Sequence, residues 1–339
     1  MALSLLVNAV LLAIPLGGSV GTLVGIDAHL AATGQKPLFH SDGGDSSSGG
    51  GSGSSGDSTG GGNGGNGSTA SNGVSNTQYC ESSWGISPPS SGELFTLNPN
   101  QWGVTTSTVG GLCMNVTTFQ NETYATKTTA PDWSVTWQYD PGPETQPVHA
   151  YPNIMIDDVL PLELENIDEI EFALHWTYGV GTTVAATTDE TTLNAESLQC
   201  NVAIDMFFDS DKTTAQNSTT ADFEVMVWFA RFGDSSDPIG YSEGVVTNHT
   251  VNGTMFELYS GTNSNSQNVL TWIAANTTEE FSGDIYPLIT DLYTLSASSS
   301  SYPSKADYLG IFQFGTEAFS ADTNVTFGVT SLSVDIKKS

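Results

Sequence analysis

The stretch Phe223–Gly240 reads FEVMVWFARFGDSSDPIG, and its first half is β-branched and aromatic, which predicts a buried strand. Successive side chains of a strand point to opposite faces. One face here is wholly apolar and holds Phe223, Val225, Val227 and Phe229, whereas the other holds Glu224, Met226 and Trp228. Burying a carboxylate among apolar groups is costly. We therefore expect Glu224 to line a groove beside Trp228, although this strand alone favours an exposed glutamate on the solvent side of a sheet.

Similar strands recur along residues 77–339, where short β-rich runs are separated by Gly, Pro, Asn and Asp. Helical periodicity appears only around Asp284–Leu295. The pattern predicts an all-β fold, and its length favours a two-sheet jelly-roll sandwich with an open substrate groove over a small immunoglobulin-like domain. We find no internal repeat of about 20 to 50 residues, which disfavours a propeller or a solenoid.

Three segments precede this domain. Residues 1–26 are apolar and carry no charged side chain, which is typical of a signal peptide or a signal-anchor. Residues 27–40 form a short juxtamembrane segment, and residues 41–76 are almost wholly Gly, Ser, Asn, Asp and Thr, which predicts a disordered linker. We expect an extracellular protein whose first segment is cleaved, or a cell-surface protein that an uncleaved segment tethers to the membrane.

The charge balance excludes one class of partner. Acidic residues outnumber basic ones by 37 to 7, giving a net charge of -30, so nucleic acid would be repelled. The few lysines and a set of eight N-x-S/T sequons favour the secretory route and a glycoprotein. The sequon asparagines are Asn66, Asn115, Asn121, Asn217, Asn248, Asn252, Asn276 and Asn324.

Motifs for metals and cofactors are absent from the sequence. None of the cysteines, Cys80, Cys113 and Cys200, forms a CxxC pair, which argues against zinc and leaves room for one disulfide. The five histidines lie far apart without HxH or HExxH spacing, and no GxSxG elbow or P-loop is present. We expect no metal and no cofactor.

Two further strands carry acids in apolar surroundings. In YLGIFQFGTEAF (residues 308–319) Gln313 and Glu317 share one face, and in NVAIDMFFDSD (residues 201–211) Asp205 interrupts a hydrophobic run. Hydrolysis of a glycosidic bond needs one carboxylate to attack or to position water and one carboxylic acid to protonate the leaving oxygen. Apolar surroundings help to keep one of them protonated. Tryptophans can stack on sugars, although each one alone is more often a core residue; the candidates are Trp84, Trp102, Trp133, Trp137, Trp176 and Trp228.

Together these segments resemble glycoside hydrolase family 12. Residues 223–240 are similar to the E-x-M-x-W…G-D-x-x-P-I-G segment of that family, and QFGTEAF (residues 313–319) is similar to its Q-F-G-T-E-P-F segment. The likeness covers about residues 78–336, because further matches follow in the family's order. They are CESSW (80–84), NPNQWG (98–103), Cys113, WQYDPGPETQPVHAYPN (137–153), NVAIDMF (201–207), LYSG (258–261) and FSGDI (281–285).

The resemblance implies a curved jelly roll and a retaining mechanism. Glu224 would be the nucleophile, Glu317 the acid/base, and Asp205 a supporting carboxylate. In such a pair the carboxyls lie roughly 5 to 5.5 Å apart. Glu317 should have a raised pKa so that it starts protonated, whereas Glu224 should stay ionised.

Further roles follow from the same resemblance. The substrate-binding set is Trp84, Asn100, Trp102, Trp137, Met226 and Trp228, of which the Trp84, Asn100 and Trp102 positions match a donor-side subsite. Cys80 and Cys113 match the family disulfide, which leaves Cys200 as a buried free thiol. Two features depart from the family: Ala318 replaces a usual proline, which should loosen a turn, and residues 179–199 look like an insertion.

We therefore expect a monomeric, extracellular endo-acting β-1,4-glucanase that cuts plant cell-wall β-glucan with retention and needs no cofactor. QFGTE favours a cellulase-type enzyme over the alternative, a xyloglucan-specific endo-β-1,4-glucanase. A non-catalytic β-glucan-binding jelly roll and a purely structural wall anchor are the competing hypotheses from other classes.

Overall fold

Two β-sheets form the fold of the chain in the computed structural model, which describes residues 66–69, 74–83, 85–119, 124–296 and 299–339. The predicted segments 1–26 and 27–40, most of the predicted linker and Trp84 lie outside the described residues. No helix in the described part of the chain is long and apolar enough to cross a membrane.

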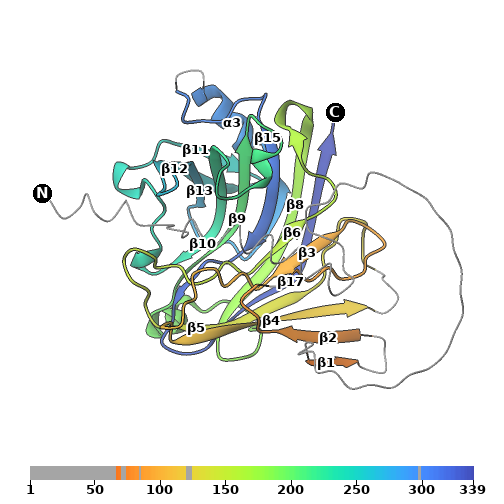
Figure 1. Cartoon of the computed structure of the whole chain (residues 1–339), viewed down its shortest axis with the longest axis vertical. Coiled ribbons are helices and arrows are strands. Elements are labelled where there is room, and N and C mark those ends of the chain that lie inside the picture. Colours follow the sequence, from red (N-terminus) through yellow and green to blue (C-terminus); the bar gives the residue numbers. More distant parts are fainter. Residues whose placement is uncertain (1–65, 70–73, 84, 120–123, 297–298) are drawn as a thin grey trace, which may run out of the picture. The chain divides into compact units, whose positions relative to one another are not determined.

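Among the residues that the structure describes, the smaller sheet has seven strands and the larger has ten, and Figure 1 shows how the two sheets are arranged. In spatial order the smaller sheet contains β1 (Asn66–Thr69), β2 (Val74–Tyr79), β4 (Gly110–Phe119), β5 (Trp133–Tyr139), β17 (Val325–Lys338), β8 (Ile167–Val180) and β14 (Glu280–Asp284). The larger contains β11 (Thr247–Val251), β12 (Thr254–Thr262), β13 (Asn268–Ala274), β10 (Phe223–Phe232), β9 (Gln199–Asp209), β15 (Tyr308–Gly315), β6 (Asn153–Ile156) and β3 (Phe95–Asn98), with β16 (Ala318–Ser320) on β9 and β7 (Leu162–Glu163) on β15. The predicted all-β two-sheet sandwich is confirmed.

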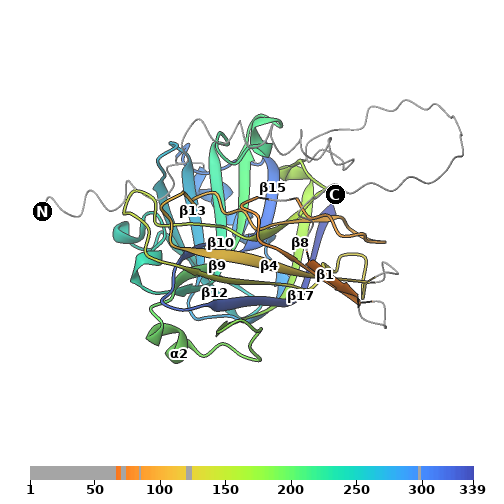
Figure 2. The same cartoon turned by 60° about the horizontal axis from the view of Figure 1, so that its bottom comes forward.

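Helical elements are few. The described residues contain α2 (Glu190–Ala195), α3 (Tyr286–Ser296) and four short 3₁₀ turns, η2 (Leu164–Asn166), η3 (Thr214–Gln216), η4 (Asp234–Ser236) and η5 (Tyr241–Glu243). Helix α3 confirms the helix predicted around Asp284–Leu295, and Pro287 lies in its first turn, where a missing N–H costs nothing. The predicted insertion 179–199 contains α2, which lies outside the sheets at the lower edge of Figure 2.

The core lies between the facing apolar sides of the sheets. Phe223, Val225, Val227 and Phe229 belong to it, as the alternation of residues 223–229 predicts. Phe229 stacks on Phe172 of β8 with ring centroids 5.6 Å apart, so aromatic contacts join the two sheets.

Strand β9 brings the acidic strands together. It pairs antiparallel with β10 on one side and with β15 on the other. Asp205 lies opposite Met226 in the first pairing and opposite Gln313 in the second. Residues that alternate on three separate stretches of sequence therefore meet on one outer face of the larger sheet.

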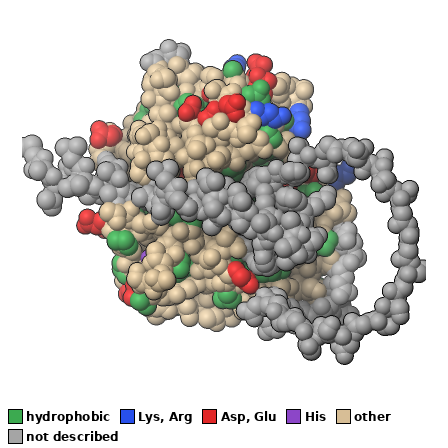
Figure 3. Space-filling view, viewed as in Figure 1, with side chains coloured by type: hydrophobic (Ala, Val, Ile, Leu, Met, Phe, Trp, Pro, Cys, Tyr) green, Lys and Arg blue, Asp and Glu red, His purple; other side chains and the backbone are tan. Residues whose placement is uncertain are grey.

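The predicted disulfide between Cys80 and Cys113 is present, and it ties the segment after β2 to β4. Cys200 is buried and free, and burial raises the pKa of its thiol. On the face shown in Figure 3 the acidic side chains lie in several separate places rather than in one patch, which fits a solubilising surface better than a binding site for a polycation.

Candidate active site

The candidate nucleophile Glu224 lies near the start of β10, on the side away from the core, and is 4% exposed. Its Oε2 accepts a hydrogen bond of 3.1 Å from Nδ2 of Asn263. Asn263 is held by Gln267, whose backbone N–H donates to Asn263 Oδ1 at 3.0 Å and whose Oε1 accepts from Asn263 Nδ2 at 2.9 Å. The amide of Gln267 in turn donates to the carbonyl oxygens of Ser218 and Ala221. The loop after β12 therefore orients the carboxyl group of Glu224.

The candidate acid/base Glu317 is the second residue after β15 and is 9% exposed. Asn201, the third residue of β9, binds it twice. Nδ2 of Asn201 donates to Oε2 of Glu317 at 2.5 Å, and the backbone N–H of Glu317 donates to Oδ1 of Asn201 at 2.9 Å. The hydroxyl of Thr316 also donates to the carbonyl oxygen of Asn201. One asparagine thus fixes both the main chain and the carboxyl group of Glu317.

Asp205 and Tyr151 complete the cluster. Asp205 is 7% exposed, and its buried Oδ1 has no hydrogen-bond partner among the described residues. Tyr151 donates its hydroxyl to the carbonyl oxygen of Ala203 at 3.0 Å. Burial raises the pKa of Tyr151 well above its ordinary value, and the charges of Asp205, Glu317 and Glu224 raise it further. The charges of all three carboxyl groups act on the hydroxyl of this one buried tyrosine. The acids predicted from separate strands therefore lie near one another.

Burial is the main reason why all three acids have raised pKa values. It raises the pKa of Glu317 to about 7 against the hydrogen bond from Asn201, and that of Glu224 to about 8, with the charge of Glu317 as the second cause. The pKa of Asp205 lies well above its ordinary value because of burial and then the charges of both glutamates. The charge of one carboxyl raises the pKa of its neighbours, so their protonation states are linked. The raised pKa of Glu317 agrees with the role of a general acid. That of Glu224 differs from the expected ionised nucleophile, because Glu224 is buried beside a second carboxyl.

Metal ligation is not indicated at this site. Throughout the described ranges, no group of three or more His, Cys, Asp and Glu side chains could hold a metal ion. The carboxylate oxygens of Glu224 and Glu317 instead accept hydrogen bonds from amides, an arrangement that suits proton transfer and nucleophilic attack.

Met226 and Trp228 lie on the same side of β10 as Glu224, apart from the main core. With Ala203 of β9 they form a small apolar cluster, and the indole Nε1 of Trp228 donates to Sδ of Met226 at 3.4 Å. They adjoin the acids as the alternation of residues 223–229 predicts. Their contact with a sugar stays a prediction.

The expectation for Trp137 is wrong. This residue belongs to β5 of the smaller sheet, its side chain is fully buried, and its Nε1 donates to the hydroxyl of Tyr178 at 2.6 Å. Alternate residues of β5 point into the core, so the indole is enclosed between the sheets and cannot reach a sugar on the outer face.

The expected donor-side segment lies after β3. Asn100 has a positive φ of 42°, and its carbonyl oxygen accepts from the backbone N–H of Tyr151 at 3.0 Å. Trp102 is partly exposed, whereas Gln101 between them is buried and donates its amide to the carbonyl oxygen of Glu81 at 2.9 Å. Tyr151 therefore links this segment to the acidic cluster, while the third member of the predicted subsite, Trp84, lies outside the described residues.

Ala318 does not loosen the chain after Glu317. Its N–H donates to the carbonyl oxygen of Ala150 at 2.9 Å, and its own carbonyl oxygen accepts from the N–H of His149 at 2.9 Å. A proline at this position would lack the donor. The expectation of a looser turn is therefore wrong, because alanine adds a backbone hydrogen bond beside the candidate acid.

Sequence reasoning missed Asn201, Asn263 and Tyr151. Asn201 shares the alternation of Asp205 in NVAIDMF, so the same period-two argument could have placed it on the site's face. Asn263 lies in a loop, and no periodic pattern points to it. Tyr151 lies in a stretch that contributes to the resemblance, but nothing in that stretch distinguishes its side chain.

Asn201→Ala tests whether Asn201 positions and tunes Glu317. The hydrogen bond from Asn201 lowers the pKa of Glu317, so its loss should raise that pKa further. Activity that needs protonated Glu317 is lost as pH rises through its pKa, so the basic limb of kcat/KM should move to higher pH, with a loss in kcat of about tenfold at the optimum. A pH profile of the two proteins measures this shift. A reduced but unshifted profile would mean that Asn201 only supports the fold.

Comparison with known proteins agrees with this geometry. A sequence model of the family described as glycosyl hydrolase family 12 matches residues 93–337. A xyloglucan-specific endo-β-1,4-glucanase A from Aspergillus niger is 27% identical over 243 residues, which cover 72% of this chain and 86% of that protein. A probable xyloglucan-specific endo-β-1,4-glucanase A from Aspergillus fumigatus is 29% identical over 267 residues, which cover 79% of this chain and 94% of that protein.

A solved structure shares the fold. The Trichoderma harzianum endoglucanase 3 of family GH12 superposes with a TM-score of 0.59 at 26% identity, covering 77% of this chain and 97% of that one. The catalytic domain of Humicola grisea Cel12A, solved with a thio cellotetraose, gives a TM-score of 0.58 at 23% identity and supports the fold alone.

Proposed function

Because the chain belongs to glycosyl hydrolase family 12, we propose that it is an endo-acting glycoside hydrolase that cuts β-1,4-glucosidic bonds of glucans with retention of configuration. The observation that carries the proposal is the pair Glu224 and Glu317. Glu224 belongs to β10 and Glu317 follows β15, the strands on either side of β9; each residue is buried, and each is oriented by an asparagine amide.

The first step is glycosylation. Glu317 in its acid form gives its proton to the glycosidic oxygen while the carboxylate of Glu224 attacks the anomeric carbon. The C–O bond to the leaving chain breaks as the ester bond to Glu224 forms. The raised pKa of Glu317 allows it to hold this proton in mildly acidic solution, and the step proceeds from the ionisation state in which Glu224 has lost its proton while Glu317 keeps its own.

The second step is hydrolysis of the glycosyl ester. Glu317, now ionised, takes a proton from water, and the oxygen of that water attacks the anomeric carbon and releases Glu224 as a carboxylate. Two inversions give net retention. The raised pKa of Asp205 favours its protonated form, which would limit the negative charge that builds up around Glu224.

The similar proteins support a β-1,4-glucan as the substrate class. The curated relatives act, by name, on xyloglucan, whereas the Trichoderma structure is an endoglucanase, so both an unbranched β-glucan and the xyloglucan alternative fit the proposal.

The test is hydrolysis of carboxymethyl cellulose, mixed-linkage β-glucan and xyloglucan side by side. We expect new reducing ends from at least one glucan, a rapid fall in viscosity from endo-cleavage, and the β-anomer as the first product in proton NMR. Affinity for these glucans without new reducing ends would instead establish the competing β-glucan-binding jelly roll.

We also propose that the protein is monomeric and extracellular, either released by cleavage of its first segment or tethered to the membrane by it. Four sequon asparagines, Asn248, Asn252, Asn276 and Asn324, are exposed, which supports a secreted glycoprotein. N-terminal sequencing of the mature protein would distinguish a cleaved signal from a retained anchor.

A further inference from the structure

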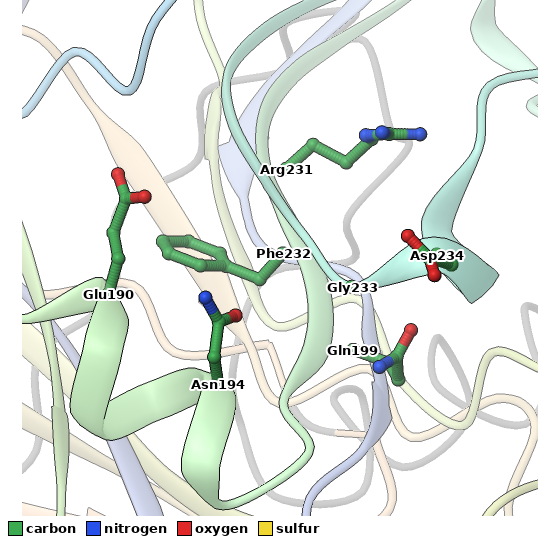
Figure 4. Close-up of a pocket in the computed structure, with 7 residues that line it drawn as sticks. All are labelled: Glu190, Asn194, Gln199, Arg231, Phe232, Gly233 and Asp234. Carbon is green, nitrogen blue, oxygen red and sulfur yellow. The ribbon is translucent and has the colours of Figure 1, made fainter.

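A cavity of about 420 Å³ lies at one end of the larger sheet, between α2, the start of β9 and the end of β10 (Figure 4). Glu190 and Asn194 reach it from α2, and Figure 4 shows Gln199 and Asp234 on the other side. Its volume falls within the range of small-ligand sites, about 300 to 1,000 Å³. Helix α2, which forms one side of the cavity, lies within residues 179–199, the segment expected from the sequence to be an insertion.

The lining of the cavity favours a neutral, hydroxyl-rich ligand. Glu190 and Asp234 contribute two carboxylates, and Arg231 is the only arginine in the sequence. Arg231 already forms an ion pair with Asp237 and lies over the ring of Tyr241, 5.0 Å from its centroid. An anionic ligand would therefore meet more negative than positive charge.

Asn194 supplies the hydrogen bonds that a sugar needs. Its side-chain amide offers donors and an acceptor, and this amide makes no hydrogen bond to any described residue. Gln199 is partly engaged, because its Oε1 accepts from the N–H of Ser235 at 2.8 Å. Phe232 also lines the cavity, but its ring is 3% exposed and packs against Trp176 and Tyr178 in the core, so the polar side chains provide the binding contacts.

Strand register places the cavity beside the candidate acid. Arg231 lies opposite Asn201 across the β10–β9 pairing, and Asn201 binds Glu317. The Cα atoms of paired residues lie about 4.5 to 5.5 Å apart, so Arg231, which lines the cavity, lies beside the residue that supports Glu317.

The same strand register indicates which part of a glucan substrate could enter the cavity. Glu224 lies opposite Phe207, six residues farther along β9 than Asn201, so the two catalytic glutamates are anchored at different levels of the strands. A glucan backbone that passes between them crosses the strands. The cavity lies beyond the Glu317 side of that path, so a backbone unit would bypass it, whereas a branch attached to the backbone could reach it.

We propose that this cavity is a branch subsite, which binds a neutral sugar substituent, such as a xylosyl unit, of a β-1,4-glucan whose backbone lies between Glu224 and Glu317. The inference rests on the proposed function and makes it more specific, because it assigns the enzyme to branched glucans.

Asn194→Phe fills the cavity from the exposed helix α2 and removes the free amide. The matched control is Ala195→Phe, which adds the same ring at the next exposed position, outside the cavity lining. The measurement is the ratio of kcat/KM on xyloglucan to kcat/KM on unbranched mixed-linkage β-glucan. We expect Asn194→Phe to lower this ratio by about tenfold, a typical effect of a mismatched substituent pocket, and Ala195→Phe to leave it unchanged.

The outcomes separate the inference from the proposed function. Wild-type protein that cleaves mixed-linkage β-glucan but not xyloglucan would support the proposed function and overturn the branch subsite. An equal ratio in wild type and Asn194→Phe would overturn it too. Wild-type protein that cleaves no glucan would refute both. Binding of a xyloglucan oligosaccharide to Glu224→Gln with and without Asn194→Phe, by calorimetry, gives a second readout, in which equal affinities contradict the subsite.

Discussion

Glu224→Gln should lower kcat on soluble β-glucan by at least about 10⁴-fold, because loss of a nucleophile removes the covalent path and leaves only binding and the remaining acid. Glutamine keeps the shape of the side chain and can still accept the hydrogen bond from Asn263. The measurement is the rate of reducing-end release at saturating substrate. Val227→Ile, a change within the core on the opposite face of β10, is the matched control and should retain most activity.

The fold should tolerate Glu224→Gln, and the raised pKa of Glu224 determines how the stability of the two proteins differs with pH. Burial raises the folded pKa of Glu224 to about 8, above that of an unfolded chain, so the folded state binds the extra proton. The contribution of protonated Glu224 to wild-type stability is therefore fully present below the unfolded pKa and is lost as pH rises through the folded pKa. Glutamine cannot ionise, so Glu224→Gln should melt at a higher temperature than wild type near pH 8 and gain nothing near pH 4. A lower Tm at both pH values would show that lost activity reflects lost structure.

Azide distinguishes a nucleophile from a residue that merely supports the site. In Glu224→Ala a small anion can occupy the vacated space and attack the anomeric carbon of dinitrophenyl β-cellobioside, expelling dinitrophenolate. The expected product is the α-glycosyl azide, identified by NMR, because a single displacement inverts the configuration. Formation of the β-azide instead would assign Glu224 to the acid/base position.

The local part of the site was predictable from sequence, because a strand repeats every two residues. The alternation in FEVMVWF assigned Glu224 and Trp228 to one face and Phe229 to the other without knowledge of any partner strand. The same alternation, applied to the strand that contains Asp205, predicted that this side chain interrupts an otherwise hydrophobic run. These assignments depend on backbone geometry alone.

Pairing and loop contacts were beyond such reasoning. Trp137 and Trp228 look alike in sequence, since both occur in β-rich runs, yet only the position of β5 in the smaller sheet makes Trp137 a core residue. Asn263 contacts Glu224 because a loop turns back at the end of β12, and that contact is set by tertiary packing. Motif resemblance compensates for part of this gap, since it links Glu224 to Glu317 without predicting how either is held.

Glu317→Gln should lower kcat on β-glucan by about 10² to 10⁴-fold, the range expected when a general acid is removed. The loss should be much smaller for glycosylation by dinitrophenyl β-cellobioside, because dinitrophenolate leaves without a proton. The basic limb of the pH profile should also disappear, since in wild type activity falls as pH rises through the raised pKa of Glu317, whereas glutamine does not titrate.

The space left in Glu317→Ala gives the complementary product. Glu224 can still form the glycosyl ester from the activated substrate, but no base remains to deprotonate water, so the ester should accumulate. Azide needs no base, and its attack on the ester makes a second inversion, which yields the β-glycosyl azide. Opposite anomers from Glu224→Ala and Glu317→Ala would assign the two carboxyls independently of any resemblance, because the product's stereochemistry records which side of the sugar each residue occupies. The same anomer from both variants would contradict the retaining assignment.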